Sequence, residues 1–211
     1  MNFLQYINKS RLIFLFILLI LTFSLLITYA KGTVQNISNS VLRLHIVANS
    51  NTTHDQELKL AVRDKVLSET SHIFRNTHSA NEAKALAKKH SALIQKTAKD
   101  EINRLGFDYP INVSVTECAF PTKVYGDIAL PSGKYNAVKI EIGKANGENW
   151  WCVMYPPLCF TEGTISVPNE TKSKLRNTLS QEEYNLVTNT QSGVVPVEVR
   201  FKIVEIFQKY F

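Results

Sequence analysis

Cys152 and Cys159 are the residues of this chain best suited to chemistry, because they lie close together in the stretch NWWCVMYPPLCF with both tryptophans and a Pro-Pro pair. Two nearby cysteines can bind a metal ion, supply a nucleophilic thiolate or form a disulfide. Zinc-binding cysteines usually stand about two to four residues apart, with a second pair or histidines close by. This pair is more widely spaced and has no such neighbours, so we expect no metal site. A thiolate needs a basic partner, for which His45 is the candidate.

The choice between a nucleophile and a disulfide depends on the compartment, which residues 12–29 (LIFLFILLILTFSLLITY) indicate. This segment carries no charge and follows Lys9 and Arg11. About 18 apolar residues can just cross a bilayer as a helix, and most signal peptides have a shorter apolar part. The positive-inside tendency places residues 31–211 outside the cytoplasm. Ala30 could end a cleavage site, so an uncleaved anchor and a cleaved signal peptide both remain open.

Export favours one role for the cysteines. Extracytoplasmic compartments are oxidising, and a second cysteine within reach favours a disulfide over a maintained thiolate. We therefore expect a disulfide between Cys152 and Cys159, which leaves Cys118 as a buried free thiol. The sequence contains no catalytic constellation and implies no metal or cofactor.

Composition indicates one folded domain and argues against nucleic-acid binding. The net charge is +6, but the basic residues are scattered among acidic ones, as on a solvated mixed-charge surface. A chain of 211 residues can hold a membrane segment and one domain. We expect residues 1–30 to form the signal peptide or membrane anchor, residues 31–40 a linker, and residues 41–211 a single extracytoplasmic domain.

The domain is expected to begin with a strand and a helix. Apolar residues alternate at residues 41–48 (VLRLHIVA), which predicts a strand with one buried face and with Arg43 and His45 on the other. The sequence THDQ at residues 53–56 fits a capping box, in which side chains satisfy the first free helical N–H groups. The helix that begins there should fade near residues 74–76.

The rest of the chain predicts a longer helix and then a sheet. Ser79 and Glu82 form a second capping box, and the helix that they begin should end at Gly106, a residue suited to a left-handed cap. These elements predict an α+β fold, in which an N-terminal membrane helix precedes a single domain of antiparallel or mixed sheet packed against two or more helices. Strands are expected at residues 111–115, 138–142 and 150–155, a loop at 161–168, a helix from Ser180, and an amphipathic helix at 197–211.

Two pairs of residues are candidates for binding. Arg43 and His45 share a strand face and could bind a carboxylate, or they could form a satisfied structural cluster. Trp150 and Trp151 point to opposite faces if they lie on a strand, so one could be an exposed binding anchor while the other packs in the core. Packing is the commoner role for a partly covered tryptophan.

Four stretches resemble the stage II sporulation protein R family of endospore-forming Firmicutes. They are residues 42–67 (LRLHIVANSNTTHDQELKLAVRDKVL), 120–126 (FPTKVYG), 130–135 (LPSGKY) and 149–160, and VEVRFK at 197–202 resembles the family's C-terminal region. The resemblance implies a non-enzymatic signalling protein that is made in the forespore and exported. It implies action across the space between the forespore and mother-cell membranes. The target would be the membrane-embedded protease stage II sporulation protein GA, which processes the sigma-E precursor in the mother cell.

The resemblance also singles out polar residues. The family's R-x-H-[apolar]₂-A-N-S segment falls on residues 43–50, and its D-Q-x-L-K-x-x-V-R-D helix falls on residues 55–64. Such polar positions exceed what a strand, turn and helix need, which supports either a recognition surface or a buried network that braces the turn. With the tryptophans, the candidate partner surface comprises Arg43, His45, Asn49, Ser50, Asp55, Gln56, Lys59, Arg63, Trp150 and Trp151. The competing hypothesis is an exported cell-envelope hydrolase that uses Cys152 or Cys159 with His45.

Overall fold

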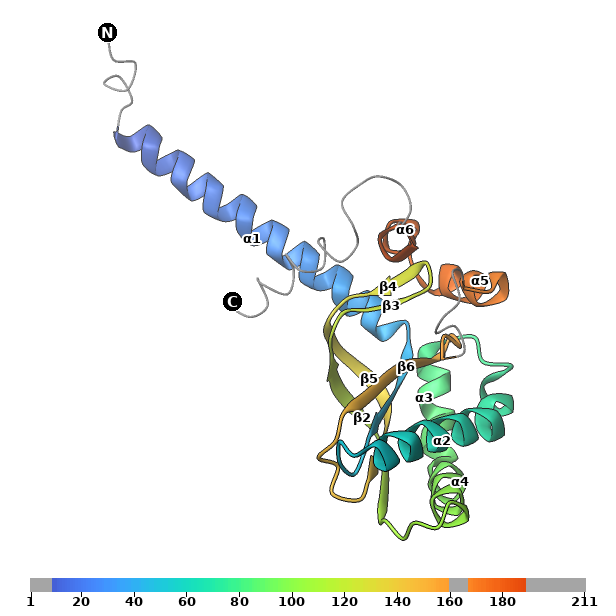
Figure 1. Cartoon of the computed structure of the whole chain (residues 1–211). Coiled ribbons are helices and arrows are strands. Elements are labelled where there is room, and N and C mark those ends of the chain that lie inside the picture. The colour runs from blue at the N-terminus through green and yellow to red at the C-terminus, as the bar shows by residue number, and fades with distance from the viewer. Residues whose placement is uncertain (1–8, 160–166, 189–211) are drawn as a thin grey trace.

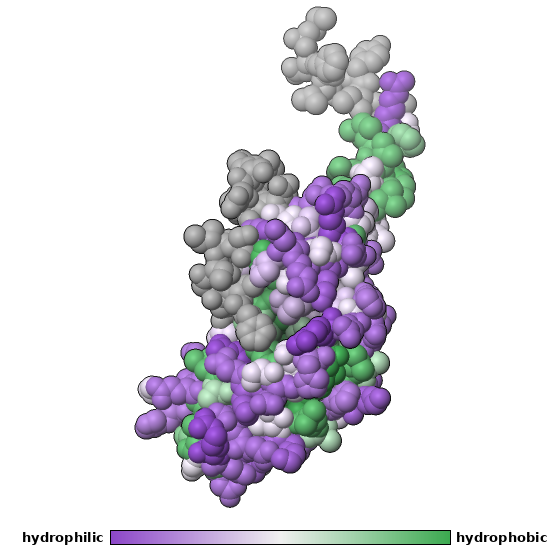
Figure 2. All heavy atoms as spheres, turned by 90° about the vertical axis from the view of Figure 1, so that its right-hand side faces the viewer, coloured by the Kyte–Doolittle hydropathy of each residue, from purple (hydrophilic) through white to green (hydrophobic). Residues whose placement is uncertain are grey.

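Helix α1 (Lys9–Asn39) leads into the folded domain of the computed structural model, which describes residues 9–159 and 167–188 (Figure 1). The large apolar side chains of its first part, from Leu12 to Leu26, are exposed. On the face that Figure 2 shows, these hydrophobic residues stand out from a domain that is mostly hydrophilic. The helix is long and apolar enough to cross a membrane, a test that a signal sequence also passes.

The last turns of α1 are part of the folded domain. Val34, Ile37 and Ser38 are buried, and they share one helix face because they lie three or four positions apart. This face packs against β5 (Gly133–Ile142). Residues 31–39, where the sequence suggested a linker, are therefore helical and contribute to the core.

Four strands form a mixed sheet in the order β2-β5-β1-β6. The interior strand β1 (Leu42–Val47) runs parallel to β5 and antiparallel to the edge strand β6 (Asn149–Tyr155). The other edge strand, β2 (Ile111–Phe120), pairs antiparallel with β5. Together with the helices, this sheet confirms the predicted α+β fold.

Three helices cover one face of the sheet: α2 (Thr53–Thr70), α3 (Ala80–Lys89) and α4 (Ser91–Arg104) (Figure 1). A short 3-10 helix, Ser71–Phe74, follows α2. Each of these helices turns apolar residues at helical spacing toward the sheet. Helices α2 and α3 contact β1, and α4 contacts β2. The helical layer thus encloses the main core against the sheet.

Helix boundaries differ from the sequence prediction at two points. The long helix expected from Ser79 is divided at His90, which leaves the helical conformation at φ −102° and ψ 14°. The division lets the helical faces before and after it each meet the sheet. Gly106 has the positive φ of +84° expected beyond the end of a helix. The residue that caps α2 is Thr52, one position before the predicted box, and its side-chain oxygen accepts from the N–H of Asp55 at 3.4 Å.

Smaller elements complete the domain beside the end of α1. They are a hairpin of β3 (Lys123–Tyr125) and β4 (Ile128–Leu130), and two helices, α5 (Asn169–Thr178) and α6 (Gln181–Thr188) (Figure 1). The start of α6 is the one predicted, because Ser180 Oγ accepts from the main-chain N–H of the third residue after it. The polar sequence of α5 gave no indication of a helix.

The last described element, α6, contacts the first. Tyr29 donates to Glu182 at 3.1 Å, and Asn36 donates to Glu183 at 3.0 Å. The helix expected at residues 197–211, and most of the loop expected at 161–168, lie outside the described residues.

Strand β1 is buried on both faces, whereas its alternating sequence predicted one buried face. Of its residues, His45 alone is partly exposed. Leu44 lies beside Cys152 on the helix side of the sheet, and Arg43 points to the side where the hairpin and α1 pack. The second cover comes from residues far along the chain, so the local pattern could not reveal it.

Candidate functional site

The polar residues after β1 bind one another. Asp55 is 4% exposed, and its carboxylate accepts hydrogen bonds from Asn49 Nδ2 at 2.8 Å and from Ser50 Oγ at 2.5 Å. The side-chain oxygen of Asn49 accepts from the main-chain N–H of Lys144 at 2.9 Å. These residues therefore brace the turn, which is one of the two roles that the sequence left open.

Electrostatics fit this bracing role. Burial alone would raise the pKa of Asp55, but hydrogen bonds from Ser50, Asn49 and Tyr109 together hold it below its ordinary value. Asp55 also lies in the first turn of α2, where the helix dipole favours a negative charge. The carboxylate is thus a charged structural group at neutral pH.

A second set of contacts ties α2 to the start of β6. Gln56 Nε2 donates to the carbonyl of Ser50 at 2.8 Å. Lys59, which is 4% exposed, donates to Gln56 Oε1 at 2.6 Å and to the carbonyl of Glu148 at 3.1 Å. Burial lowers the pKa of Lys59. At Gly147 an added Cβ would lie 2.3 Å from the carbonyl oxygen of Ser50, so glycine allows the two loops to approach.

Arg43 is fully buried in a cage of aromatic rings. Its guanidinium carbon lies 4.1 Å from the ring centre of Phe120 and 4.8 Å from that of Tyr135. Arg43 Nη2 donates to the Tyr125 hydroxyl, which in turn donates to the carbonyl of Trp151 at 3.2 Å. Cation–π contacts of this kind stabilise a desolvated cation. Arg43 therefore belongs to the core and cannot form part of an exposed surface.

His45 lies at the edge of this cage. It donates through Nε2 to Asn149 Oδ1 at 2.7 Å, and its ring stacks on Trp151 with centroids 6.3 Å apart. Burial lowers the pKa of His45, despite the opposing effect of the bond to Asn149. The imidazole is therefore neutral at neutral pH and serves to position the tryptophan.

The two tryptophans lie on opposite faces of β6 and each meets a cation. The guanidinium carbon of Arg63, on α2, lies 4.1 Å from the ring centre of Trp150. Lys123 Nζ, at the start of β3, lies 5.3 Å from that of Trp151. Both rings line a hollow of about 320 Å³ between α2, β6 and Lys123. We call this hollow the tryptophan groove; Gln56, Lys59, Leu60, Glu148 and Asn149 also line it.

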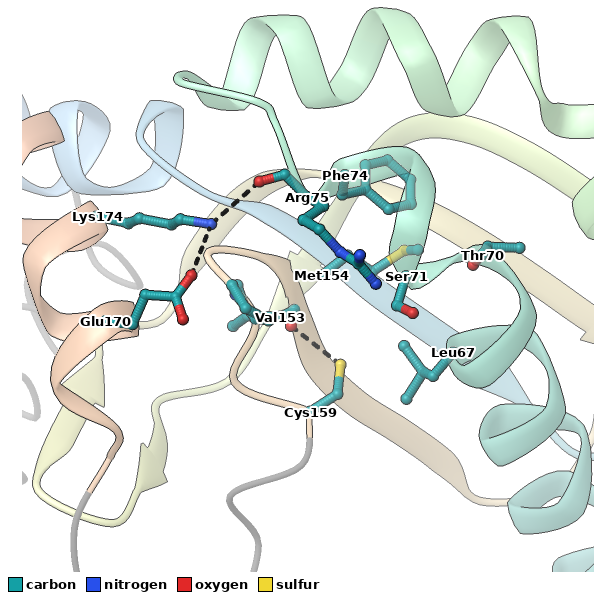
Figure 3. A pocket seen from close by; sticks show the side chains of 11 residues that line it. Leu67, Thr70, Ser71, Phe74, Arg75, Val153, Met154, Cys159, Glu170 and Lys174 are labelled. Carbon is teal, nitrogen blue, oxygen red and sulfur yellow. Dashed lines mark hydrogen bonds and ion pairs between the residues drawn. The ribbon is translucent and has the colours of Figure 1, made fainter.

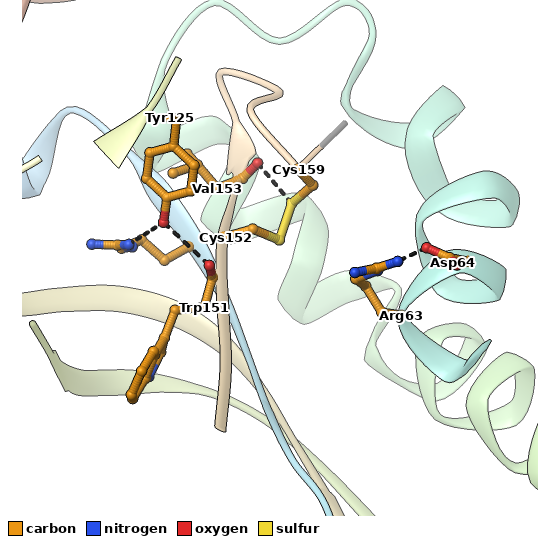
Figure 4. Close-up of a disulfide and its surroundings, with 8 residues drawn as sticks. Arg63, Asp64, Tyr125, Trp151, Cys152, Val153 and Cys159 are labelled. Carbon is orange, nitrogen blue, oxygen red and sulfur yellow. Dashed lines mark hydrogen bonds and ion pairs between the residues drawn. A yellow bond between two sulfur atoms is a disulfide. The ribbon is translucent and has the colours of Figure 1, made fainter. Parts of the chain in front are cut away.

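Cys152 and Cys159 form a disulfide, and their Cα atoms are 5.0 Å apart (Figure 4). Both thiols are therefore consumed, so neither can serve as the nucleophile of the hydrolase hypothesis. His45 is also misplaced for that role, because it pairs with Trp151 while Cys152 lies on the other face of the sheet. Cys118 is free and half-buried, and burial raises the pKa of its thiol.

A second hollow, of about 250 Å³, adjoins the disulfide (Figure 3). Its lining is mostly apolar and includes Leu67, Phe74 and Met154. At its rim Lys174 forms an ion pair with Glu170 at 3.4 Å. Among the described residues no group of His, Cys, Asp or Glu side chains is arranged to hold a metal ion.

The ten candidate residues thus separate into three groups. Asn49, Ser50, Asp55, Gln56 and Lys59 brace the turn, and Arg43 is in the core. His45, Arg63, Trp150 and Trp151 gather at or beside the tryptophan groove. The sequence reasoning missed Lys123 and Glu148, although Lys123 lies in one of the four stretches with a family resemblance.

Comparison with known proteins agrees with that resemblance. Residues 38–165 match the family model described as stage II sporulation protein R. Stage II sporulation protein R of Bacillus subtilis (strain 168) is 34% identical over 162 residues, which cover 74% of this chain and 72% of that protein. No solved structure gives a significant match.

Proposed function

The chain belongs to the stage II sporulation protein R family, and from this premise we propose that it is an exported sporulation signal. In this proposal, residues 31–211 leave the forespore and act in the space between the forespore and mother-cell membranes. There they activate the membrane-embedded protease stage II sporulation protein GA, which then processes the sigma-E precursor in the mother cell. The protein itself acts as a ligand of the protease and carries out no chemistry.

The observation that carries the proposal is the continuity of α1 with the domain. The helix combines an exposed apolar part suited to a membrane with a last turn buried in the domain core. Export through residues 12–29 would therefore deliver the whole domain to the outer surface of the membrane. The disulfide supports this location, because disulfides persist in oxidising compartments outside the cytoplasm.

Activation requires that the domain bind the active state of the protease more tightly than the inactive state. A ligand with equal affinity for both states shifts no equilibrium, however tightly it binds. Bracing of the turn after β1 suits such a ligand, because a rigid surface loses little conformational entropy on binding. Among the described residues, the tryptophan groove is the hollow part of the candidate surface, where a partner could bind.

Co-expression in a non-sporulating host tests the proposal. The protease, the sigma-E precursor and the full chain are expressed together, and each is omitted in turn. We expect precursor cleavage only when all three are present. Cleavage without this chain, or no cleavage with all three proteins produced and in the membrane fraction, would contradict the assignment.

A further inference from the structure

Strand β6 offers an open edge for a partner strand. It is the last strand of the sheet, and the described part of the chain places no further strand beside it. The carbonyl oxygens of Trp151 and Val153 accept hydrogen bonds from the Tyr125 hydroxyl at 3.2 Å and the Leu158 N–H at 3.1 Å. Neither donor belongs to β1, so these residues direct their main-chain groups outward. Alternation in an antiparallel ladder directs those of Asn149 outward as well.

The tryptophan groove lies along the open part of this edge. Leu158 occupies the edge at its Val153 end, and the Tyr125 hydroxyl takes one lone pair of the Trp151 carbonyl. The main-chain groups of Asn149 face the groove, which Asn149 and Trp151 line. Helix α2 forms one wall of the groove, and Lys123 lines the opposite wall. An extended peptide added to a sheet edge gains main-chain hydrogen bonds, and neighbouring pockets select its side chains. The geometry therefore suits an extended segment better than a compact ligand.

The charges around the groove define the chemistry of that segment. Lys123 forms no ion pair with any described residue, and Lys59 and Arg63 add positive charge nearby. The opposing charges are those of Glu148, which is exposed, and of Asp64, which pairs with Arg63 at 2.7 Å. The balance is cationic, so a bound segment should carry carboxylates.

The two indole rings add donors that lack acceptors. The Nε1 atoms of Trp150 and Trp151 are buried and have no hydrogen-bond partner among the described residues. An indole N–H can only donate, and a buried donor without a partner costs about 1–3 kcal/mol. A segment rich in carbonyl and carboxylate oxygens would supply acceptors, provided that the indole rings rotate to turn their N–H groups toward the groove.

The groove also lies on the side of the domain remote from α1. Strand β1 begins with Leu42, directly after α1, and there it pairs with Tyr155. Its other end, Val47, pairs with Asn149. Because β1 leads away from the helix, the groove end of β6 points away from the membrane in which α1 would lie (Figure 1).

We propose that an extended acidic segment of the protease, on its extracytoplasmic side, adds as a strand to the β6 edge at Asn149–Trp151 and places a carboxylate on Lys123. This inference rests on the proposed function for the identity of the partner. The site itself is defined by the strand edge, the groove and the cations. Because α2 is braced to β6 through Lys59, the segment meets a preformed groove.

Intrinsic fluorescence can test the site directly, because the chain has two tryptophans and both line the groove. The probe is a seven-residue peptide that alternates threonine and glutamate, titrated into the full chain in detergent micelles. We expect a saturable change in tryptophan fluorescence that weakens with added salt, and no change with the threonine–lysine counterpart. Lys123→Glu should weaken binding at least tenfold. The matched control is Lys134→Glu, at an exposed position of β5 away from the groove; it should bind as the unaltered chain does.

Absence of a saturable change with the acidic peptide, or equal affinity for the Lys123→Glu variant, would overturn the groove assignment. The co-expression assay, run with both variants, separates this failure from failure of the proposed function. If the unaltered chain and Lys123→Glu trigger cleavage equally, the groove proposal is wrong and the signalling function stands. If the acidic peptide binds through Lys123 but the unaltered chain triggers no cleavage, the protease assignment is wrong and the peptide site stands.

Discussion

Substitution of Asp55 tests whether the polar residues after β1 are structural. Asp55→Asn keeps the size of the side chain but removes its charge. Ser50 and Asn49 each donate to this carboxylate, and a hydrogen bond to a charged group contributes about 1.5–3 kcal/mol. Both donors bind the same oxygen, Oδ2, so the amide oxygen of the variant can still accept from them and only the charge-dependent part is lost. We expect the free energy of unfolding to fall by about 2 kcal/mol at pH 7.

The pH dependence of this difference supplies a second readout. The folded-state pKa of Asp55 lies below its ordinary value, so the carboxylate stabilises the fold above the unfolded-state pKa of about 3.9. That contribution is lost as the pH falls below this value and through the lower folded-state pKa. The unaltered chain should therefore lose its advantage over Asp55→Asn under acid conditions.

Urea unfolding followed by tryptophan fluorescence, between pH 7 and pH 3, measures both effects. The control is Asp64→Asn on the same helix, because the Asp64 side chain is 64% exposed. Removal of the Asp64 charge should change the free energy of unfolding by no more than about 0.5 kcal/mol. A loss below about 1 kcal/mol for Asp55→Asn, or a difference that persists unchanged at pH 3, would refute the bracing role.

Three further predictions concern the core, the disulfide and the loops. Arg43→Ala should lower the free energy of unfolding by about 3 kcal/mol, because it empties the aromatic cage; a loss under about 1 kcal/mol in urea unfolding would contradict core burial. Replacing Cys152 and Cys159 together by serine should lower the free energy of unfolding by about 2.5 kcal/mol. In the unaltered chain, mass measurement after alkylation should show that both thiols are blocked until the disulfide is reduced. Gly147→Ala should cost about 2 kcal/mol by overpacking, whereas Gly32→Ala, which has no neighbour within 4 Å, should leave thermal stability unchanged or slightly higher.

Local sequence patterns predicted those parts of the fold that depend on neighbouring residues. Alternation located β2 and β5, and Gly106 marked the end of a helix with its positive φ. The break at His90 was missed because no proline or glycine marks it. It arises because two helical faces must both meet the same sheet, which is a tertiary requirement.

The candidate site shows the same division between local and distant causes. The sequence identified Asp55 and Trp151 as unusual but could not distinguish a brace from a binding surface. That distinction depends on what lies opposite: the turn at Gly147 meets Ser50, and the rings of Phe120 and Tyr135 enclose Arg43. These partners come from segments about 75 to 100 positions away in sequence, where no short-range pattern can connect them.

The continuity of α1 with the domain core has a mechanical consequence. An anchored domain is held by a stiff strut instead of a flexible tether, because Val34 and Ile37 fix the helix to the sheet. The domain contacts α1 from Tyr29 onward, through the hydrogen bond to Glu182, so an anchored domain would sit directly against its own bilayer. Such a strut can reach a target in the opposite bilayer only where the gap between the two is narrow, which would make the signal sensitive to how closely the two membranes lie.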